Sequence, residues 1–162
     1  MGFLSTFWGK LLTTFFISMV PVIELRGAIP WGEAIGLDLW ISAVVSAFGN
    51  MLPVPFIILF IRKIFEWMRL KNEWLGNLVA RFEAKAEKHK EKVKKYEFWG
   101  LFLFVAIPLP GTGAWTGALV AAMLEMRLKD AVPSIFLGVV IATILVSMFT
   151  AGLFSVFSSI FG

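Results

Sequence analysis

The sequence predicts an all-α integral membrane protein made of two inverted repeats, each a re-entrant helical hairpin followed by a transmembrane helix, and joined by a long basic amphipathic helix. Two observations lead to this prediction. The first is composition: of 162 residues, 59% are hydrophobic and 16% are charged, whereas soluble domains average about 45–50% apolar and about 25% charged residues. The second is punctuation, because prolines and glycines interrupt two apolar segments at matching places in the two halves.

The first interruption, residues 21–30, contains two prolines together with Glu24, Arg26 and Gly27. Proline lacks a backbone donor and clashes with the preceding helical turn, so a continuous helix through this stretch is disfavoured. Opened backbone at membrane depth persists only where it is buried in protein or faces water. The pattern fits either a re-entrant hairpin over residues 8–37 or a kinked spanning helix.

A clean span follows this interruption. Residues 39–61 carry no charge, and their helix would be about 34 Å long at 1.5 Å per residue, which is enough to cross a bilayer. Asp38 stands at the N-cap position, where its carboxylate can accept from free backbone N–H groups. Prolines near the middle predict a kink, and Asn50 places a polar side chain at membrane depth. The first repeat therefore covers residues 1–61, with its span over 38–61.

Residues 62–97 are the soluble-looking part of the chain and hold eleven of its fifteen lysines and arginines. The positive-inside rule places this segment in the cytoplasm. Apolar residues recur there at steps of three and four, as on one face of an amphipathic helix. Such a helix lies on lipid headgroups, packs on the membrane domain or pairs with a copy of itself, and the narrow stripe favours the last two. The stripe comprises Leu75, Leu78, Phe82, Ala86, His89, Val93 and Tyr96.

The second repeat, residues 98–162, has the same order as the first. Residues 98–124 are uncharged. The apolar arms on either side of their interruption are each about ten residues, or about 15 Å of helix, which is half of a 30 Å hydrocarbon core. That length favours a re-entrant hairpin over 98–124. After a short charged loop, the remaining uncharged residues predict a span over 131–152 and a short interfacial tail. The interruption contains Pro108, Pro110, Gly111, Thr112 and Gly113.

The two interruptions carry the groups that can bind a ligand. An ionisable side chain at bilayer depth costs about 3 kcal/mol and needs a partner or a wet cavity. Glu24 and Arg26 therefore either bind substrate or a coupling ion, or pair with each other and hold the hairpin tip. The glycines of the second interruption precede a helix that starts near Ala114, whose free N–H groups attract a phosphate or carboxylate.

Inverted repeats bring their interruptions face to face near the membrane midplane. We therefore expect the charged side chains of the first interruption close to the Thr112–Gly113 backbone of the second. The candidate substrate- or ion-binding residues are Glu24, Arg26, Gly27, Asn50, Pro108, Pro110, Gly111, Thr112 and Gly113.

Other residue types narrow the range of functions. The chain has no cysteine, and its one histidine, His89, lies outside the apolar segments. Enzyme activity, a metal site, a cofactor and a nucleic-acid partner are therefore not expected. Expected partners are membrane lipids, an amphipathic or lipid-phosphate substrate and a second copy of the chain, since one copy encloses too little to surround a polar cavity. Five tryptophans suit interfacial belts: Trp8, Trp31, Trp40, Trp99 and Trp115.

The stretches ELRGAIP (residues 24–30) and PLPGTGAWTG (residues 108–117) resemble the putative small multi-drug export protein family, over nearly the whole chain. That family in turn resembles the DedA superfamily of VTT-domain membrane proteins, whose members are described with two inverted re-entrant hairpins, each followed by membrane helices. Some of them translocate lipid carriers such as undecaprenyl phosphate, coupled to protons or sodium. The resemblance implies a multi-pass transporter in the cell membrane.

The resemblance further implies that the substrate is an amphipathic anion, a lipid phosphate carrier or a small drug-like molecule, moved with ion or proton coupling. DedA proteins usually carry arginines in the second hairpin, whereas this chain has none in residues 98–124. An anion site would therefore rest on Arg26 and the 111–113 backbone. The alternative is a non-transporting membrane scaffold that acts through the 62–97 helix.

Overall fold

The computed structural model describes residues 6–74, 76–77, 79–80, 96–109 and 112–161. Within these residues all regular secondary structure is helical, which confirms the predicted all-α class. Two helical segments, Leu39–Ile61 and Leu128–Leu153, are long and apolar enough to cross a membrane. Most of the predicted amphipathic helix over 62–97, with the centre of its stripe, lies outside the described residues.

In the first half, two short helices precede a long one. The interruption between the short helices is shorter than predicted: it covers residues 19–23, and Pro30 lies inside the second helix. A proline there removes the N–H that would bond the carbonyl of Arg26, but the helix continues through it. The helices of this half are α1 (Phe7–Ser18), α2 (Glu24–Ala34), α3 (Leu39–Met51) and α4 (Pro53–Lys71).

The boundary between α3 and α4 confirms the predicted irregularity in the first span. Pro53 and Pro55 occupy the first turn of α4, so two carbonyls at the end of α3 have no helical donor. Asp38 is the N-cap residue of α3, as predicted, but its side chain makes no capping hydrogen bond. The side chain is exposed instead, where water can satisfy its carboxylate.

The second half has the same order of helices. Its second short helix begins at Ala114, as predicted. The apolar span ends at Leu153, close to the predicted end near Gly152, but the helix itself does not stop there and is continuous to Phe161. No proline follows Pro133 and no charge follows Asp130, so nothing in the sequence stops that helix. The helices of this half are α6 (Glu97–Ala106), α7 (Ala114–Met123) and α8 (Leu128–Phe161).

The second short helix of each half ends in the same way. The N–H of Leu37 donates to the carbonyl of Gly32 at 2.9 Å, and the N–H of Met126 donates to the carbonyl of Ala121 at 3.0 Å. In both places the residue before the donor has a left-handed backbone, with φ of 82° and 58°. This is the Schellman motif, and it turns each short helix back toward the long helix that follows.

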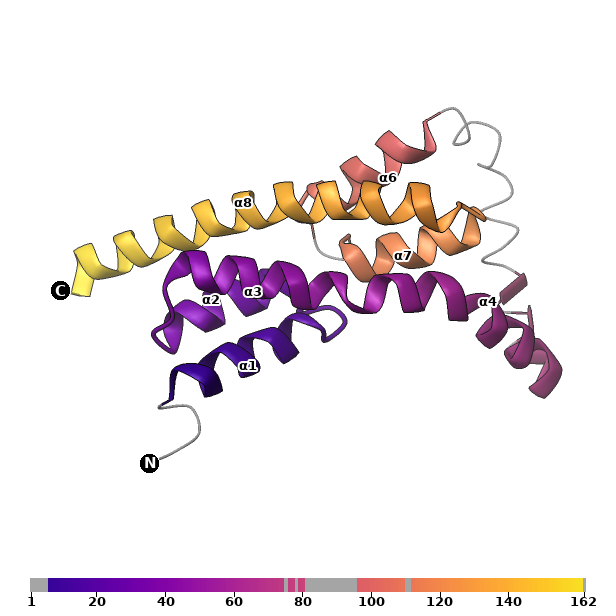
Figure 1. Cartoon of the computed structure of the whole chain (residues 1–162), viewed down its shortest axis with the longest axis horizontal. Helices are drawn as coiled ribbons and strands as arrows, with labels where there is room; N and C mark the ends of the chain where they lie inside the picture. Colours follow the sequence, from indigo (N-terminus) through magenta and orange to yellow (C-terminus); the bar gives the residue numbers. More distant parts are fainter. Residues whose placement is uncertain (1–5, 75, 78, 81–95, 110–111, 162) are drawn as a thin grey trace.

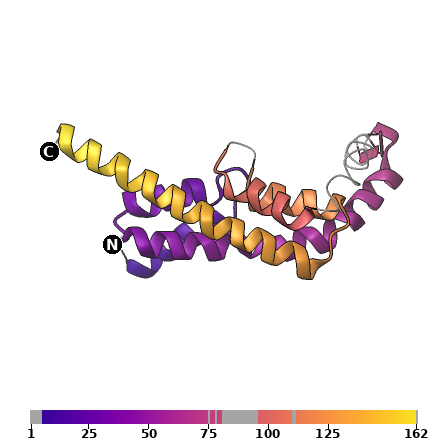
Figure 2. The ribbon, with the colours of Figure 1, turned by 90° about the horizontal axis from the view of Figure 1, so that it is seen from above.

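The two hairpins enter the molecule from opposite ends. In Figure 1 the α1–α2 hairpin lies along α3 at the left, whereas at the right α7 lies between α8 and α4 and α6 lies on the other side of α8. The C-terminal end of α8 and the start of α1 share the left end, whereas the end of α4 shares the right end with the start of α8. Figure 2 shows the same separation from above. Across the halves, α2 packs on α8 and α7 packs on α4, so each hairpin touches the long helix of the other half.

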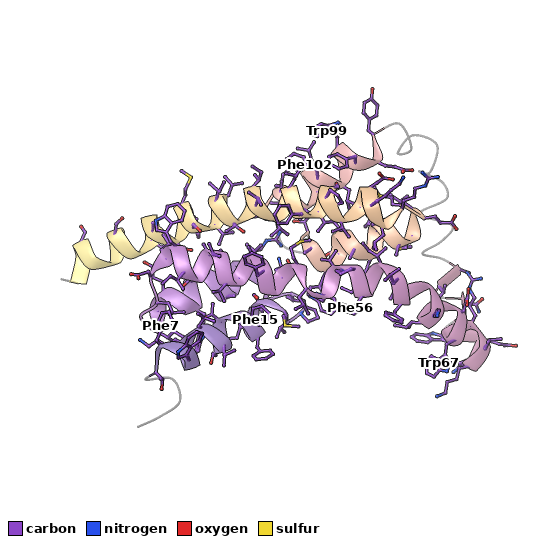
Figure 3. All side chains as sticks on the ribbon, in the orientation of Figure 1. Phe7, Phe15, Phe56, Trp67, Trp99 and Phe102 are labelled. Atoms are coloured by element: carbon purple, nitrogen blue, oxygen red, sulfur yellow. The ribbon has the colours of Figure 1, made fainter. Side chains whose placement is uncertain are left out.

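The outer surface is apolar, and small side chains fill the interior. Large hydrophobic side chains point outward from α1, α4 and α6, among them Phe7, Phe56 and Trp99 in Figure 3. Soluble monomers rarely expose a contiguous surface of this kind, so it suits contact with lipid. Inside, residues such as Ala28 and Ala118 are fully buried, and their size lets the helices approach closely.

Candidate functional site

Glu24, at the start of α2, is buried and caps a helix of the other half. Only 3% of its surface is exposed, and its Oε1 accepts a hydrogen bond from the backbone N–H of Trp115 at 3.1 Å. The N–H of Ala114 lies next to the same carboxylate. These are the first N–H groups of α7, where unpaired donors give the helix end a positive partial charge. The carboxylate of the first half therefore occupies the anion site of the second.

Gly113 makes room for this contact. It is the N-cap residue of α7 and has φ of 146°, a conformation that residues with a Cβ rarely adopt. A methyl group added there would run into Oε2 of Glu24, and it would lie 2.8 Å from Cδ and 2.9 Å from Oε1. A residue other than glycine at this position would displace the carboxylate.

Arg26, one residue beyond Leu25 in the first turn of α2, also reaches the second interruption. Its guanidinium donates to the carbonyl of Thr112, to the hydroxyl of Thr112 at 3.0 Å and to the carbonyl of Ile107 at 3.4 Å. The Nε donor is buried and has no hydrogen-bond partner among the described residues. Among the residues that the structure describes, Arg26 thus bonds to the opposite interruption and not to Glu24, and its Nε donor has no partner.

The hydroxyl of Thr112 holds the second interruption in shape. It lies 2.7 Å from the carbonyl of Ile107 and 2.9 Å from that of Leu109, so its single proton bonds one of the two. Its oxygen accepts from the Arg26 guanidinium and from the N–H of Leu109 at 3.3 Å. Thr112 therefore organises the loop that receives Arg26, whereas Glu24 caps α7.

The expected meeting of the two interruptions is present. Glu24 lies against Gly113 and Arg26 bonds to Thr112, as the sequence predicts. Trp115 belongs to this site too, which the sequence did not indicate: its indole N–H donates to the carbonyl of Met19 at 3.1 Å. It was expected in an interfacial belt. The sequence feature that could have placed Trp115 at this site is its position two residues after the second glycine, at the start of a helix.

Three further candidate residues that the structure describes, Gly27, Asn50 and Pro108, are not at this contact. Gly27 lies in the first turn of α2, where its N–H donates to Ile23, and Pro108 is exposed. Asn50 is fully buried on α3, and neither atom of its amide has a partner in the described part of the chain. Pro110 and Gly111 lie outside the described residues.

The chemistry that this contact offers is binding of anions and protons. It combines a carboxylate, a guanidinium whose Nε donor has no partner in the described part of the chain, and the N-terminal end of a helix. The described residues contain no group of three or more His, Cys, Asp or Glu side chains that could hold a metal ion. A carboxylate at a helix N-terminus and an incoming anion would compete for the same N–H groups.

Comparison with known protein families gives a match for most of the chain. A family model described as putative small multi-drug export protein matches residues 24–145, about three quarters of the 162-residue chain. The matched region begins at Glu24 and includes both interacting segments and the first two thirds of α8's apolar span. No curated protein and no solved structure matches the chain.

Proposed function

The chain belongs to the putative small multi-drug export protein family, and we propose that it is a transporter of an amphipathic anion, with its substrate site where the two interruptions meet. The observation that carries this proposal is the contact between the Glu24 carboxylate and the first N–H groups of α7, beside Arg26. A contact that only held two helices together would not need two ionisable side chains in the first turn of α2, since such groups are costly at membrane depth.

We propose that the protein is a multi-pass protein of the cell membrane and that its halves are inverted repeats. Helices α1, α2, α6 and α7 are 10–12 residues long, or about 15–18 Å, half of a 30 Å core. Entry from opposite ends supports re-entrant hairpins on opposite sides, as in the DedA superfamily. The basic 62–97 segment then faces the cytoplasm.

Cysteines at Lys88 and at exposed Ser159 should accordingly label from opposite sides of intact membranes.

The mechanism follows from competition for one helix end. Charged Glu24 occupies the N–H groups of Ala114 and Trp115, which excludes another anion. Once Glu24 takes up a proton, its hydrogen bond loses its charge-assisted strength, and the substrate's anionic group replaces it beside the unused donor of Arg26. Proton uptake and anion binding are thereby coupled, without an enzyme reaction or a cofactor.

The surface beside the site supports an amphipathic substrate. An open groove between α4 and α7 is lined by apolar side chains, among them Phe56, Phe60, Leu119 and Trp115. Trp115 belongs both to this groove and to the Glu24 contact. An apolar tail would lie in the groove while its anionic head reaches the α7 N-terminus. A lipid phosphate such as undecaprenyl phosphate and a smaller drug-like anion both have this chemistry.

The test is flux into proteoliposomes under a pH gradient. Two anionic probes separate the substrate sources: an NBD-labelled prenyl phosphate and the soluble dye carboxyfluorescein. Glu24→Gln is expected to lose the gradient-driven part of the flux but to keep slow equilibration, because the amide fills the same space and carries no exchangeable charge. Asp130→Asn, an exposed carboxylate in the first turn of α8, is the matched control and should transport like the wild type.

Two outcomes would contradict the proposal. If ethidium, a drug-like cation, is transported and neither anion is, the site does not bind anions. If no probe moves, the scaffold alternative through the 62–97 helix gains support.

A homodimer, which would close the polar contact off from lipid, stays a prediction that mass measurement in detergent can test.

A further inference from the structure

Three polar side chains inside the first half are buried without a partner. Ser42, Ser46 and Asn50 are fully buried and lie four residues apart, on one face of α3. Both hydroxyls and both amide atoms lack a hydrogen bond to any described residue. A buried polar group left unpaired costs about 1–3 kcal/mol, and in native proteins such groups usually bind ordered water.

This face of α3 packs against polar residues of α1. A methyl group added at Gly32 of α2 would lie 2.9 Å from Cβ of Ser42 and 3.1 Å from Cγ2 of Thr14. A methyl group at Gly49 would collide with the hydroxyl of Ser18 and lie 2.6 Å from the carbonyl of Phe15. We define the polar seam as Thr14, Ser18, Ser42, Ser46 and Asn50, all of them fully buried.

The polar seam runs from one surface of the protein to the depth of Glu24. Helices α2 and α3 are antiparallel neighbours, and Gly32 lies level with Ser42. Asn50 is eight residues beyond Ser42, and Glu24 is eight residues before Gly32, so both are about 12 Å further into the protein.

The outer end of the seam is charged. Lys10 of α1 donates to the carbonyl of Gly36 at 3.3 Å, which places its ammonium at the turn between α2 and α3. Glu33 of α2 has a buried carboxylate oxygen without a partner in the described part, and Asp38 before α3 is exposed. Each of the three helices around the seam therefore supplies or adjoins a charged group at this end.

The other half shows that packing alone does not require these polar residues. Gly138 of α8 corresponds to Gly49: a methyl group there would lie 2.9 Å from the carbonyl of Phe102 and 2.7 Å from Cβ of Val105. The two halves can be aligned by matching Gly49 with Gly138 in the long helices, and Phe15 with Phe102 in the first short helices. In this alignment every seam residue has a buried apolar counterpart. The pairs are Thr14 and Leu101, Ser18 and Val105, Ser42 and Ala131, Ser46 and Ile135, and Asn50 and Val139.

We propose that the polar seam binds a chain of water molecules that connects Glu24 with the membrane surface at the α2–α3 turn. The ligand is water, held by the free hydroxyls of Ser42 and Ser46 and by the Asn50 amide. The chain gives protons a route to a carboxylate that is almost fully buried. Its end point rests on the proposed transport site, but the hydration of the seam does not.

Cysteine accessibility tests the water chain directly, because the natural chain has no cysteine. Ser46→Cys and its apolar counterpart Ile135→Cys are exposed in membranes to Ag⁺, an ion small enough to follow a chain of water. The protein is then denatured, and the thiols that remain are counted with a maleimide. A thiol that meets water should be blocked at least about tenfold faster than one in dry packing.

Equal, slow blocking of both cysteines would overturn the water chain. If Ser46→Cys does not fold, Asn50→Cys and Val139→Cys provide the same comparison one turn deeper. The result is independent of transport. Fast blocking of Ser46→Cys together with unchanged gradient-driven flux in Glu24→Gln would support the seam and reject the transport site. An unreactive Ser46→Cys with loss of gradient-driven flux in Glu24→Gln would do the reverse.

Discussion

Arg26→Ala is expected to reduce anion flux to nearly the level of protein-free liposomes. The change removes the bonds to Thr112 and Ile107 and leaves Glu24 without the cation beside it. Losing one partner of a buried charged contact costs about 3–5 kcal/mol. Because Arg26 is only half-buried, we expect about 2 kcal/mol, or a fall in flux of about thirtyfold.

Two further variants separate charge from geometry. Arg127→Ala removes an exposed arginine before α8 and should leave flux unchanged. Arg26→Lys keeps the charge but not the planar fork that bonds two groups at once, so its flux should be intermediate. Equal flux in the wild type and Arg26→Ala would show that Arg26 has only a structural role.

Gly113→Ala is expected to disrupt the contact between the halves from the other side. The added methyl group meets the Glu24 carboxylate, and φ of 146° is strained for alanine. Strain of this kind costs about 1–3 kcal/mol, so flux should fall about fivefold or more. Gly100→Ala is the matched control, since a methyl group at this position on α6 meets nothing within 4 Å. If Gly113→Ala transports like Gly100→Ala, Glu24 does not occupy the α7 N-terminus during transport.

The meeting of the two interruptions could be predicted from the sequence because each has a need that the other meets. A carboxylate and a guanidinium in apolar surroundings require polar neighbours, and the free N–H groups at the start of α7 require acceptors. The groups to which each of these two side chains bonds could not be predicted from the sequence. The sequence left open whether Glu24 and Arg26 pair with each other; in the structure both lie in the first turn of α2 and project toward different groups of the second interruption.

Two other features depend on information that a sequence pattern lacks. Pro30 was placed in the interruption, yet helix α2 tolerates it because only one backbone bond is lost. The polar seam was visible only as Asn50, since serines and threonines are common in membrane helices. Its partners became apparent when the α2–α3 turn fixed which residues of α1, α2 and α3 lie level with one another.

The most direct measurement of the central claim is the amide resonance of Trp115 in protein labelled with ¹⁵N-tryptophan. The chain has seven tryptophans, and Trp115→Phe identifies the relevant signal. If Glu24 caps α7, Glu24→Gln will move the backbone amide signal of Trp115 upfield, because a neutral acceptor makes a weaker hydrogen bond than a carboxylate. The indole signal of Trp115, which reports the bond to Met19, should move little. A backbone amide signal of Trp115 that is the same in both proteins would contradict the shared site.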